Sequence, residues 1–268
     1  MKIVILAMDD PLYTNRFIKG IIDARKEDIV KFVYVSKGDR MTIGRDKSKI
    51  DYLLSLFLIM GPVYFFRNSL MTVFHKIQKN LSRFAPFIKS PLVVDYARKL
   101  GVDSMVIENP NRIEFIETLE KLEIDVIINQ SQSIIKKDLL DIPKIGVINR
   151  HNALLPKNRG RLTPFWVLYK NEPETGVSIH FVEEWIDSGD IIVQKRFPID
   201  DRDTFRDVVE KNYQLAGEAI LEALDRLEAG DYSLIENEDD LASHNTTPTI
   251  KQAWEYRFRR ILSIWNRS

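Results

Sequence analysis

The sequence predicts an α/β protein: a Rossmann-like, mostly parallel sheet with helices on both faces, followed by a small C-terminal helical extension. The strand-like segments of the first half are apolar on both faces, as strands are when helices cover both sides of a sheet. Segments with the apolar spacing of helices separate them, and this alternation is typical of parallel sheets. We expect a catalytic domain at residues 1–200 and, at residues 201–268, a helical extension for dimerisation or docking.

The first half alternates predicted strands and helices. The strands are short apolar runs at residues 2–8, 29–36, 102–108, 124–130 and 146–151. The first helix carries four apolar residues on one face, Phe17, Ile18, Ile21 and Ile22. Another helix is expected at residues 90–101, with Ser90 as its cap, Pro91 in its first turn and Gly101 at its end. A further helix is expected at residues 111–122.

Residues 52–66 are almost entirely apolar and raise the question of a membrane-spanning helix. Such a helix needs about 20 apolar residues, and the Gly61-Pro62 pair breaks this segment near its middle. We therefore expect no transmembrane span but a helical hairpin that is buried or faces a partner. The next stretch has the spacing of an amphipathic helix, with apolar residues Leu70, Val73, Phe74, Ile77 and Leu81. Association with a membrane surface is the alternative interpretation.

The second half adds two strand-like runs within residues 174–199, on either side of an acidic turn that contains glycine. Thr204 and Asp207 form a capping pair for a long helix that Gly230 ends. The apolar face of that helix consists of Phe205, Val208, Val209, Leu215, Ile220, Leu224 and Leu227. The last segment carries an apolar stripe of Trp254, Phe258, Ile261, Leu262 and Trp265. We interpret this stripe as a docking or homodimer face rather than a nucleic-acid platform.

Composition limits the classes of function. Acidic and basic residues balance at 39 each, so no global field attracts nucleic acid. The chain has no cysteine, which excludes disulfides, thiolate catalysis and cysteine-based zinc sites. The N-terminus lacks the basic start, the longer apolar run and the cleavage site of a secretory signal. We therefore expect a cytoplasmic protein with no metal site and no nucleic-acid partner.

Three polar residues form the candidate catalytic site. Asn149 and His151 end a predicted strand at the edge where parallel sheets bind ligands, and strand alternation places them on the same face. An imidazole exchanges protons near neutral pH, and an amide can donate a hydrogen bond to a developing oxyanion. Asp187, in the later acidic turn, is expected to orient His151 and to hold a proton or a water molecule. A satisfied structural histidine is the competing interpretation of His151, and it is the one we expect for His180.

The sequence around these residues resembles the N10-formyltetrahydrofolate-dependent formyltransferase family. The signature of that family runs Asn-x-His, small residues, Leu-Pro, Arg-Gly, a Thr-Gly-Val strand and an Asp-x-Gly turn. Here "NRHNALLPKNRG" is followed by "PFW" and by "ETGVSIHFVEEWIDSGDIIVQ" in the same order. The resemblance covers residues 1–200 in arrangement and is specific in residues 125–195. It implies catalytic roles for Asn149, His151 and Asp187, and N10-formyltetrahydrofolate as the co-substrate.

The resemblance also implies a mechanism and a folate site. The unprotonated amine of the acceptor attacks the formyl carbon, Asn149 and protonated His151 stabilise the oxyanion, and Asp187 orders His151 and helps to move the proton. The pterin is expected against two segments, Gln132, Ser133, Ile134 and Ile135, and Val182, Glu183, Glu184, Trp185 and Ile186. Weaker candidates for substrate binding are Asp9, Asp10, Arg159 and Arg161.

Differences within the family indicate a small-molecule acceptor. The loop "DDPLY" lacks the glycine-rich phosphate cradle of the purine-pathway branch. Few residues follow Gly230 and the net charge is zero, which disfavours the tRNA-modifying branch. The remaining resemblance is to the branch that formylates nucleotide-linked amino-deoxysugars, such as a UDP- or dTDP-linked 4-amino-4,6-dideoxyhexose or a pseudaminic-acid-type precursor. Two alternatives stay open: transfer to another amine, such as hydroxyornithine or an aminoacyl group, and a non-catalytic folate-binding or scaffold protein.

Overall fold

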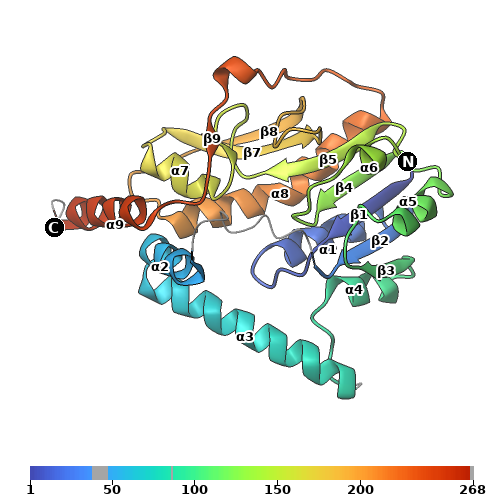
Figure 1. Ribbon diagram of the computed structural model, residues 1–268, viewed down its shortest axis with the longest axis horizontal. Coiled ribbons are helices and arrows are strands. Elements are labelled where there is room, and N and C mark those ends of the chain that lie inside the picture. Colours follow the sequence, from blue (N-terminus) through green and yellow to red (C-terminus); the bar gives the residue numbers. More distant parts are fainter. Residues whose placement is uncertain (38–47, 86, 266–268) are drawn as a thin grey trace.

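The computed structural model describes residues 1–37, 48–85 and 87–265, and it confirms the predicted α/β fold (Figure 1). The strands of its main sheet are β1 Ile3–Ala7, β2 Ile29–Val35, β3 Ser104–Ile107, β4 Val126–Gln130, β5 Gly146–His151, β7 Glu174–Phe181 and β8 Ile191–Pro198. Within the described residues these seven strands lie in the order β3-β2-β1-β4-β5-β7-β8. The neighbours from β3 to β5 pair in parallel, whereas β7 pairs antiparallel with both β5 and β8.

Helices connect the strands and cover the sheet. They are α1 Thr14–Arg25, α2 Lys49–Met60, α3 Pro62–Phe84, α4 Val93–Lys99, α5 Ile113–Glu120, α6 Lys137–Leu140, α7 Thr163–Tyr169, α8 Phe205–Glu228 and α9 Ile250–Trp265. Two short strands, β6 Arg159–Gly160 and β9 His244–Asn245, pair in parallel outside the main sheet. This pairing ties the segment after the catalytic strand to the C-terminal part of the chain.

The predicted start of the helix, with Ser90 as its cap and Pro91 in its first turn, is two residues too early. Leu92 is extended (φ −71°, ψ 140°) and is the residue before the helix, so α4 begins at Val93 and Pro91 lies outside its first turn. The Ser90 hydroxyl donates to Asp95 Oδ2 at 2.5 Å and accepts from the Leu92 N–H at 3.3 Å. It accepts from no N–H of the helix itself, so the predicted cap at Ser90 is wrong.

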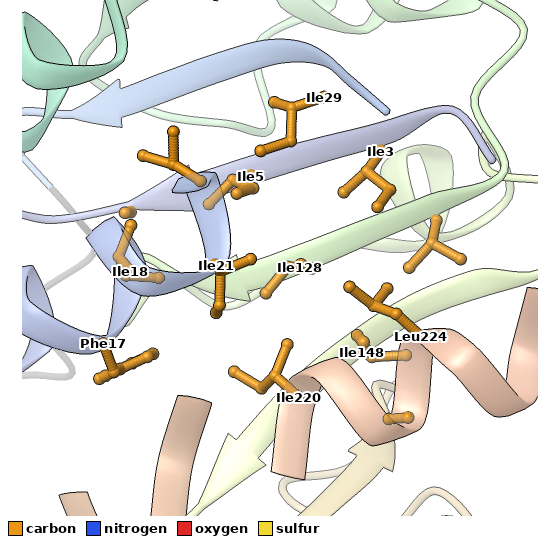
Figure 2. Close-up of a cluster of buried hydrophobic side chains, with 14 of the residues drawn as sticks. Ile3, Ile5, Phe17, Ile18, Ile21, Ile29, Ile128, Ile148, Ile220 and Leu224 are labelled. Atoms are coloured by element: carbon orange, nitrogen blue, oxygen red, sulfur yellow. The ribbon is translucent and has the colours of Figure 1, made fainter. Parts of the chain in front are cut away.

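Apolar residues fill both faces of the sheet. On one face, Ile3 and Ile5 of β1 and Ile128 of β4 belong to the same buried cluster as α1, α4 and α8, part of which Figure 2 shows. On the other face, the alternate residues of β1 pack in a second cluster with α5 and α6. Both faces of the central parallel strands β1 and β4 are thus buried, as their apolar sequences predict.

Helix α8 packs into the core of the sheet. Its residues Ile220 and Leu224 lie beside Ile148 of β5 in Figure 2, and all three side chains are almost fully buried. The predicted capping box is present, because the Thr204 N–H donates to Asp207 Oδ2 at 2.8 Å and the Asp207 N–H donates to the Thr204 hydroxyl at 3.4 Å. The domain division at residue 200 remains a prediction, and α8, C-terminal to it, shares the core of the sheet.

The α2–α3 hairpin and α9 lie at the periphery of the molecule. Gly61, with φ +76°, ends α2, and Pro62 begins α3, which confirms the helical hairpin (Figure 1). Among the described helices, none combines the length and the apolar character that crossing a bilayer requires. Helix α9 contacts α2 and leaves Trp254 and Phe258 more than half exposed, while the side chain of Trp265 lies outside the described residues.

Candidate active site

The end of β5 and the turn between β7 and β8 bring the three candidate catalytic residues to one cavity. Asn149 and His151 lie on the same face of β5, and β7 runs antiparallel beside it, so the turn after β7 returns to the end of β5. There, His151 Nδ1 lies 3.3 Å from Asp187 Oδ2. Both side chains are largely buried, with 6% and 12% exposed. Residues that are distant in sequence therefore form one polar site in a sheltered position.

Both ring nitrogens of His151 face hydrogen-bond acceptors. Nε2 donates to the carbonyl oxygen of Asn158 at 2.8 Å, and Nδ1 faces the carboxylate of Asp187. A neutral imidazole has only one N–H, so it can satisfy only one of these acceptors. His151 thus spans the Asn158 carbonyl and the Asp187 carboxylate, and these two contacts fix the position of its ring at the cavity.

Asp187 is held ionised by its surroundings. Burial by itself would raise the pKa of this carboxyl, but His151, His180 and the Gly160 N–H, which donates to Oδ2 at 2.9 Å, outweigh burial and hold the pKa below its ordinary value. Asp187 adopts a left-handed backbone conformation, with φ +54°. The Asn237 side chain donates to the Asp187 carbonyl at 2.9 Å and so fixes this turn from the C-terminal part of the chain.

His180 is not the satisfied structural histidine that the sequence predicts. It is 1% exposed, and its Nδ1 donates to the Phe181 carbonyl at 2.7 Å. Burial lowers the pKa of His180 to about 4, with a smaller opposing effect of the Asp187 charge, so the ring is neutral near pH 7. Its Nε2 is buried without a hydrogen-bond partner in the described part of the chain and lies 3.6 Å from Asp187 Oδ1. His180 therefore lies beside the Asp187 carboxylate in the lining of the cavity.

A chain of hydrogen bonds orients the Asn149 amide. Arg150 Nε donates to Gln130 Oε1 at 3.3 Å, and Gln130 Nε2 donates to Asn149 Oδ1 at 2.9 Å. The Arg150 guanidinium is itself fixed between two rings, 4.5 Å from the centroid of Tyr213 and 5.0 Å from that of Phe17. Because Oδ1 is the acceptor, the Asn149 NH₂ group stays available, with no acceptor among the described residues. Asn149 thus presents donors, not an acceptor, at the cavity.

Sequence reasoning missed Gln130, Arg150 and Asn237. Gln130 ends β4 directly beside β5, and its place at the ligand-binding edge is the signal that could have found it. Arg150 alternates with the catalytic pair, so the strand pattern places it on the far side, where the sequence indicates no ligand role. Asn237 lies in an irregular segment remote in sequence, and nothing in its local pattern indicates contact with the catalytic turn.

The cavity has a volume of about 560 Å³, within the usual range of ligand sites. All nine residues predicted to contact the folate line it, in the loop after β4 and the turn after β7. The Ser133 hydroxyl is buried in this wall and has no hydrogen-bond partner in the described residues. A polar group of a bound ligand could pair with this hydroxyl. Binding of folate here remains a proposal.

The four weaker substrate candidates divide into two pairs. Asp10 and Arg161 line the cavity, whereas Asp9 and Arg159 do not. Asp9 Oδ2 lies 2.8 Å from Nε2 of His75 on α3. Arg159 is buried and donates to Asn237 and to Asp239, because the β6–β9 pairing draws the C-terminal segment over it. Asp9 and Arg159 therefore hold the structure together around the site instead of facing it.

Comparison with known proteins relates the chain to formyl transferases. Residues 95–224 match the formyl transferase family. A methionyl-tRNA formyltransferase of Fusobacterium nucleatum is 30% identical over 165 residues, which cover 61% of this chain and 53% of the relative. A second methionyl-tRNA formyltransferase, of Syntrophus aciditrophicus, is 35% identical, and the match covers 52% of this chain and 44% of the relative. The chain thus spans about half the length of the first curated relatives that it matches.

Solved structures share the fold at low identity. A sugar N-formyltransferase from a Shewanella species has 19% identity and a TM-score of 0.56, and the match covers 92% of this chain and 77% of that chain. An N-formyltransferase from Helicobacter canadensis, solved with folinic acid and dTDP-3-aminofucose, has 20% identity and a TM-score of 0.54, with 92% and 71% covered. These likenesses establish the fold over nearly the whole chain.

Proposed function

We propose that this protein transfers the formyl group of N10-formyltetrahydrofolate to the amine of a nucleotide-linked amino-deoxysugar. The observation that carries the proposal is the convergence of Asn149, His151 and Asp187 on one cavity that all nine expected folate contacts also line. The match of residues 95–224 to formyl transferases supports the same reaction. A cytoplasmic location stays a prediction.

In this proposal each of the three side chains has its own part in the reaction. The folate supplies the formyl carbon. As the amine nitrogen bonds to that carbon, negative charge develops on the formyl oxygen of the tetrahedral intermediate. The carbonyl reforms, and this charge is lost, as the bond to the folate nitrogen breaks. The Asn149 NH₂ group donates to this oxygen, and the imidazolium of His151 stabilises its charge. Asp187, held ionised, orders His151 and accepts, directly or through water, the proton that the attacking nitrogen loses. The folate nitrogen takes up a proton as it leaves.

Aromatic residues on the rest of the cavity wall support a nucleotide-sugar acceptor. Tyr13, Tyr52, Tyr64 and Tyr213 come from the loop after β1, the α2–α3 hairpin and α8, and all of them line the cavity with Arg161. Tyrosine rings can stack on a base or a sugar while their hydroxyls bind its polar edge. Arginine binds phosphate oxygens in a bidentate manner. The ligand named for the Helicobacter canadensis structure is of this chemical class.

Methionyl-tRNA is the second candidate acceptor. The curated relatives described above are named methionyl-tRNA formyltransferases, and this observation favours it. Against it stands the balance of 39 acidic and 39 basic residues, because proteins that bind tRNA usually concentrate positive charge.

Turnover with matched acceptors tests the proposal. The purified chain is incubated with N10-formyltetrahydrofolate and, separately, with UDP- and dTDP-linked amino-deoxysugars, methionyl-tRNA and hydroxyornithine. We expect formylated sugar, detected by mass spectrometry, and a rate about 10² to 10³ lower with Asn149→Ala. If methionyl-tRNA is the one acceptor that is formylated, the proposed sugar acceptor is wrong, whereas the proposed formyl transfer is supported. Folate binding without turnover of any amine would refute the enzymatic role.

A further inference from the structure

Helix α3 carries an apolar stripe that the described chain leaves largely exposed. The stripe consists of Val63, Phe66, Leu70, Phe74, Ile77 and Leu81, which recur every three or four positions and so share one face of the helix. Each of these side chains is about half exposed or more, and Val63 reaches 82%. A continuous exposed stripe of this kind marks an interaction surface, because scattered single residues would not align.

The stripe faces away from the body of the protein. The residues of α3 that are buried are Tyr64 and Asn68, and at 100° per residue they project from the opposite side of the helix. Tyr64 lines the catalytic cavity. Figure 1 shows α3 along the lower side of the molecule, away from the sheet. The helix thus uses one side for the fold and presents the other to its surroundings over a length of about 34 Å, at 1.5 Å per residue.

The charged residues of helix α3 are exclusively basic. Helix α3 contains no aspartate or glutamate, although acidic and basic residues balance over the whole chain. Arg67, Lys76 and Arg83 are exposed and have no carboxylate within ion-pair distance among the described residues. At the end of the helix and just after it, Phe84 and Phe87 are 86% and 88% exposed. Exposed phenylalanines flanked by cations are typical of helices that lie in the interface of an anionic bilayer.

We propose that the α3 stripe docks this protein on the surface of an anionic lipid membrane, with α3 parallel to the bilayer plane. A second copy of the chain fits less well. Two α3 helices packed along their stripes would bring together two segments that carry only basic charges, and neither has an acidic side chain to offset the repulsion. An anionic surface instead complements these charges along the whole helix. This proposal is independent of the reaction proposed above.

Vesicle binding tests the proposal with the intact chain. Vesicles of phosphatidylglycerol and phosphatidylcholine are compared with vesicles of phosphatidylcholine alone in a sedimentation assay at low salt. We expect partition at least about tenfold stronger on the anionic vesicles. The double substitution Phe66→Gln with Phe74→Gln should weaken it at least about tenfold, because each phenylalanine loses its apolar insertion. The triple substitution Arg67→Gln, Lys76→Gln and Arg83→Gln should weaken partition onto the anionic vesicles, by at most about fivefold for each charge removed.

A matched control separates the stripe from general stickiness. Val106 on β3 and Ile113 on α5 are 52% and 59% exposed, similar to the stripe residues but on another part of the surface. The double substitution Val106→Gln with Ile113→Gln should leave vesicle binding equal to that of the unchanged protein. All variants should show the same thermal unfolding midpoint within a few degrees, since the altered side chains are exposed. The proposal is overturned if anionic vesicles bind no better than neutral ones. It is also overturned if stripe and control variants bind alike, or if the stripe variants dissociate a dimer that light scattering detects without lipid.

Discussion

The orientation of the Asn149 amide depends on Gln130, and the substitution Gln130→Glu tests this dependence. Gln130 Nε2 donates to Asn149 Oδ1 at 2.9 Å, while Gln130 Oε1 accepts from Arg150 Nε at 3.3 Å. A carboxylate at position 130 keeps the contact with Arg150 and adds an ion pair to it. It cannot donate to Asn149. Two oxygen acceptors would then face each other at hydrogen-bond distance, and the Asn149 amide is expected to rotate so that its NH₂ group donates to the new carboxylate instead.

The rotated amide presents its oxygen to the cavity. The formyl oxygen of the bound folate then faces the Asn149 Oδ1, which is an acceptor, and loses the hydrogen bond from the Asn149 NH₂ group. Removal of one oxyanion donor costs about 10² to 10³ in kcat, equivalent to roughly 2.7–4 kcal/mol. We therefore expect Gln130→Glu to lower kcat by at least about 10², with little change in the affinity for the folate, because residue 130 lies beside the catalytic strand and not in the segments predicted to bind the pterin.

A double-mutant cycle on formyl transfer provides the assay. If Gln130 acts through Asn149, Gln130→Glu should have almost no further effect in the Asn149→Ala background. Gln214→Glu, the same change at an exposed position on α8, is the matched control for added charge and should leave kcat unchanged. The reasoning fails if Gln130→Glu keeps kcat within about threefold of the unchanged protein. It also fails if the two effects multiply in the double variant, or if the single variant unfolds at a much lower temperature.

Three further predictions concern stability. A Cβ on Gly160, at φ +99°, would lie 2.2 Å from the Asn245 carbonyl oxygen, so Gly160→Ala should lower the free energy of unfolding by about 2 kcal/mol or more in urea titrations, and wild-type stability would disprove this. Because the pKa of His180 is lowered to about 4, the unfolded chain binds more protons than the folded one between about pH 4 and 6.5, so stability should fall as the pH drops. Between about pH 7 and 5 the free energy of unfolding should fall by about 2 kcal/mol, and His180→Gln should reduce this loss. The same slope of stability against pH in the variant and the unchanged protein would contradict the prediction. Thr204→Ala removes the capping box with Asp207 and should cost about 0.5–2 kcal/mol, whereas an unchanged unfolding midpoint would show that the cap is not needed.

The elements of the fold could be predicted from the sequence because each depends on local patterns. The apolar runs of β1 and β5 specify buried strands, and Thr204 with Asp207 specifies the start of α8. The predicted start of α4 is too early because the extended backbone after Pro91 continues through Leu92, so Ser90 does not cap the helix. Local patterns set the type of an element more firmly than its ends.

The candidate site could be predicted only in part. Strand alternation places Asn149 and His151 on one face, and this follows from the sequence. The direction in which the Arg159 side chain points does not follow from the sequence, because it depends on the C-terminal segment that pairs with β6. The same holds for Gln130, whose role comes from a neighbouring strand. Side chains whose partners are distant in sequence therefore escape prediction even where the strands themselves are predicted correctly.

The α2–α3 hairpin links the cavity to the outer surface of the molecule. Tyr52 and Tyr64 of the hairpin line the cavity, whereas Phe66 and Phe74 project from the opposite side of α3. A substitution on the exposed side therefore leaves the cavity wall in place, and a substitution of Tyr64 leaves the stripe in place. Catalysis and surface docking can for this reason be separated experimentally, although one helix carries both. If formyl transfer to a soluble acceptor fell together with vesicle binding in the Phe66→Gln and Phe74→Gln variant, the two sides of α3 would have to be coupled through its backbone.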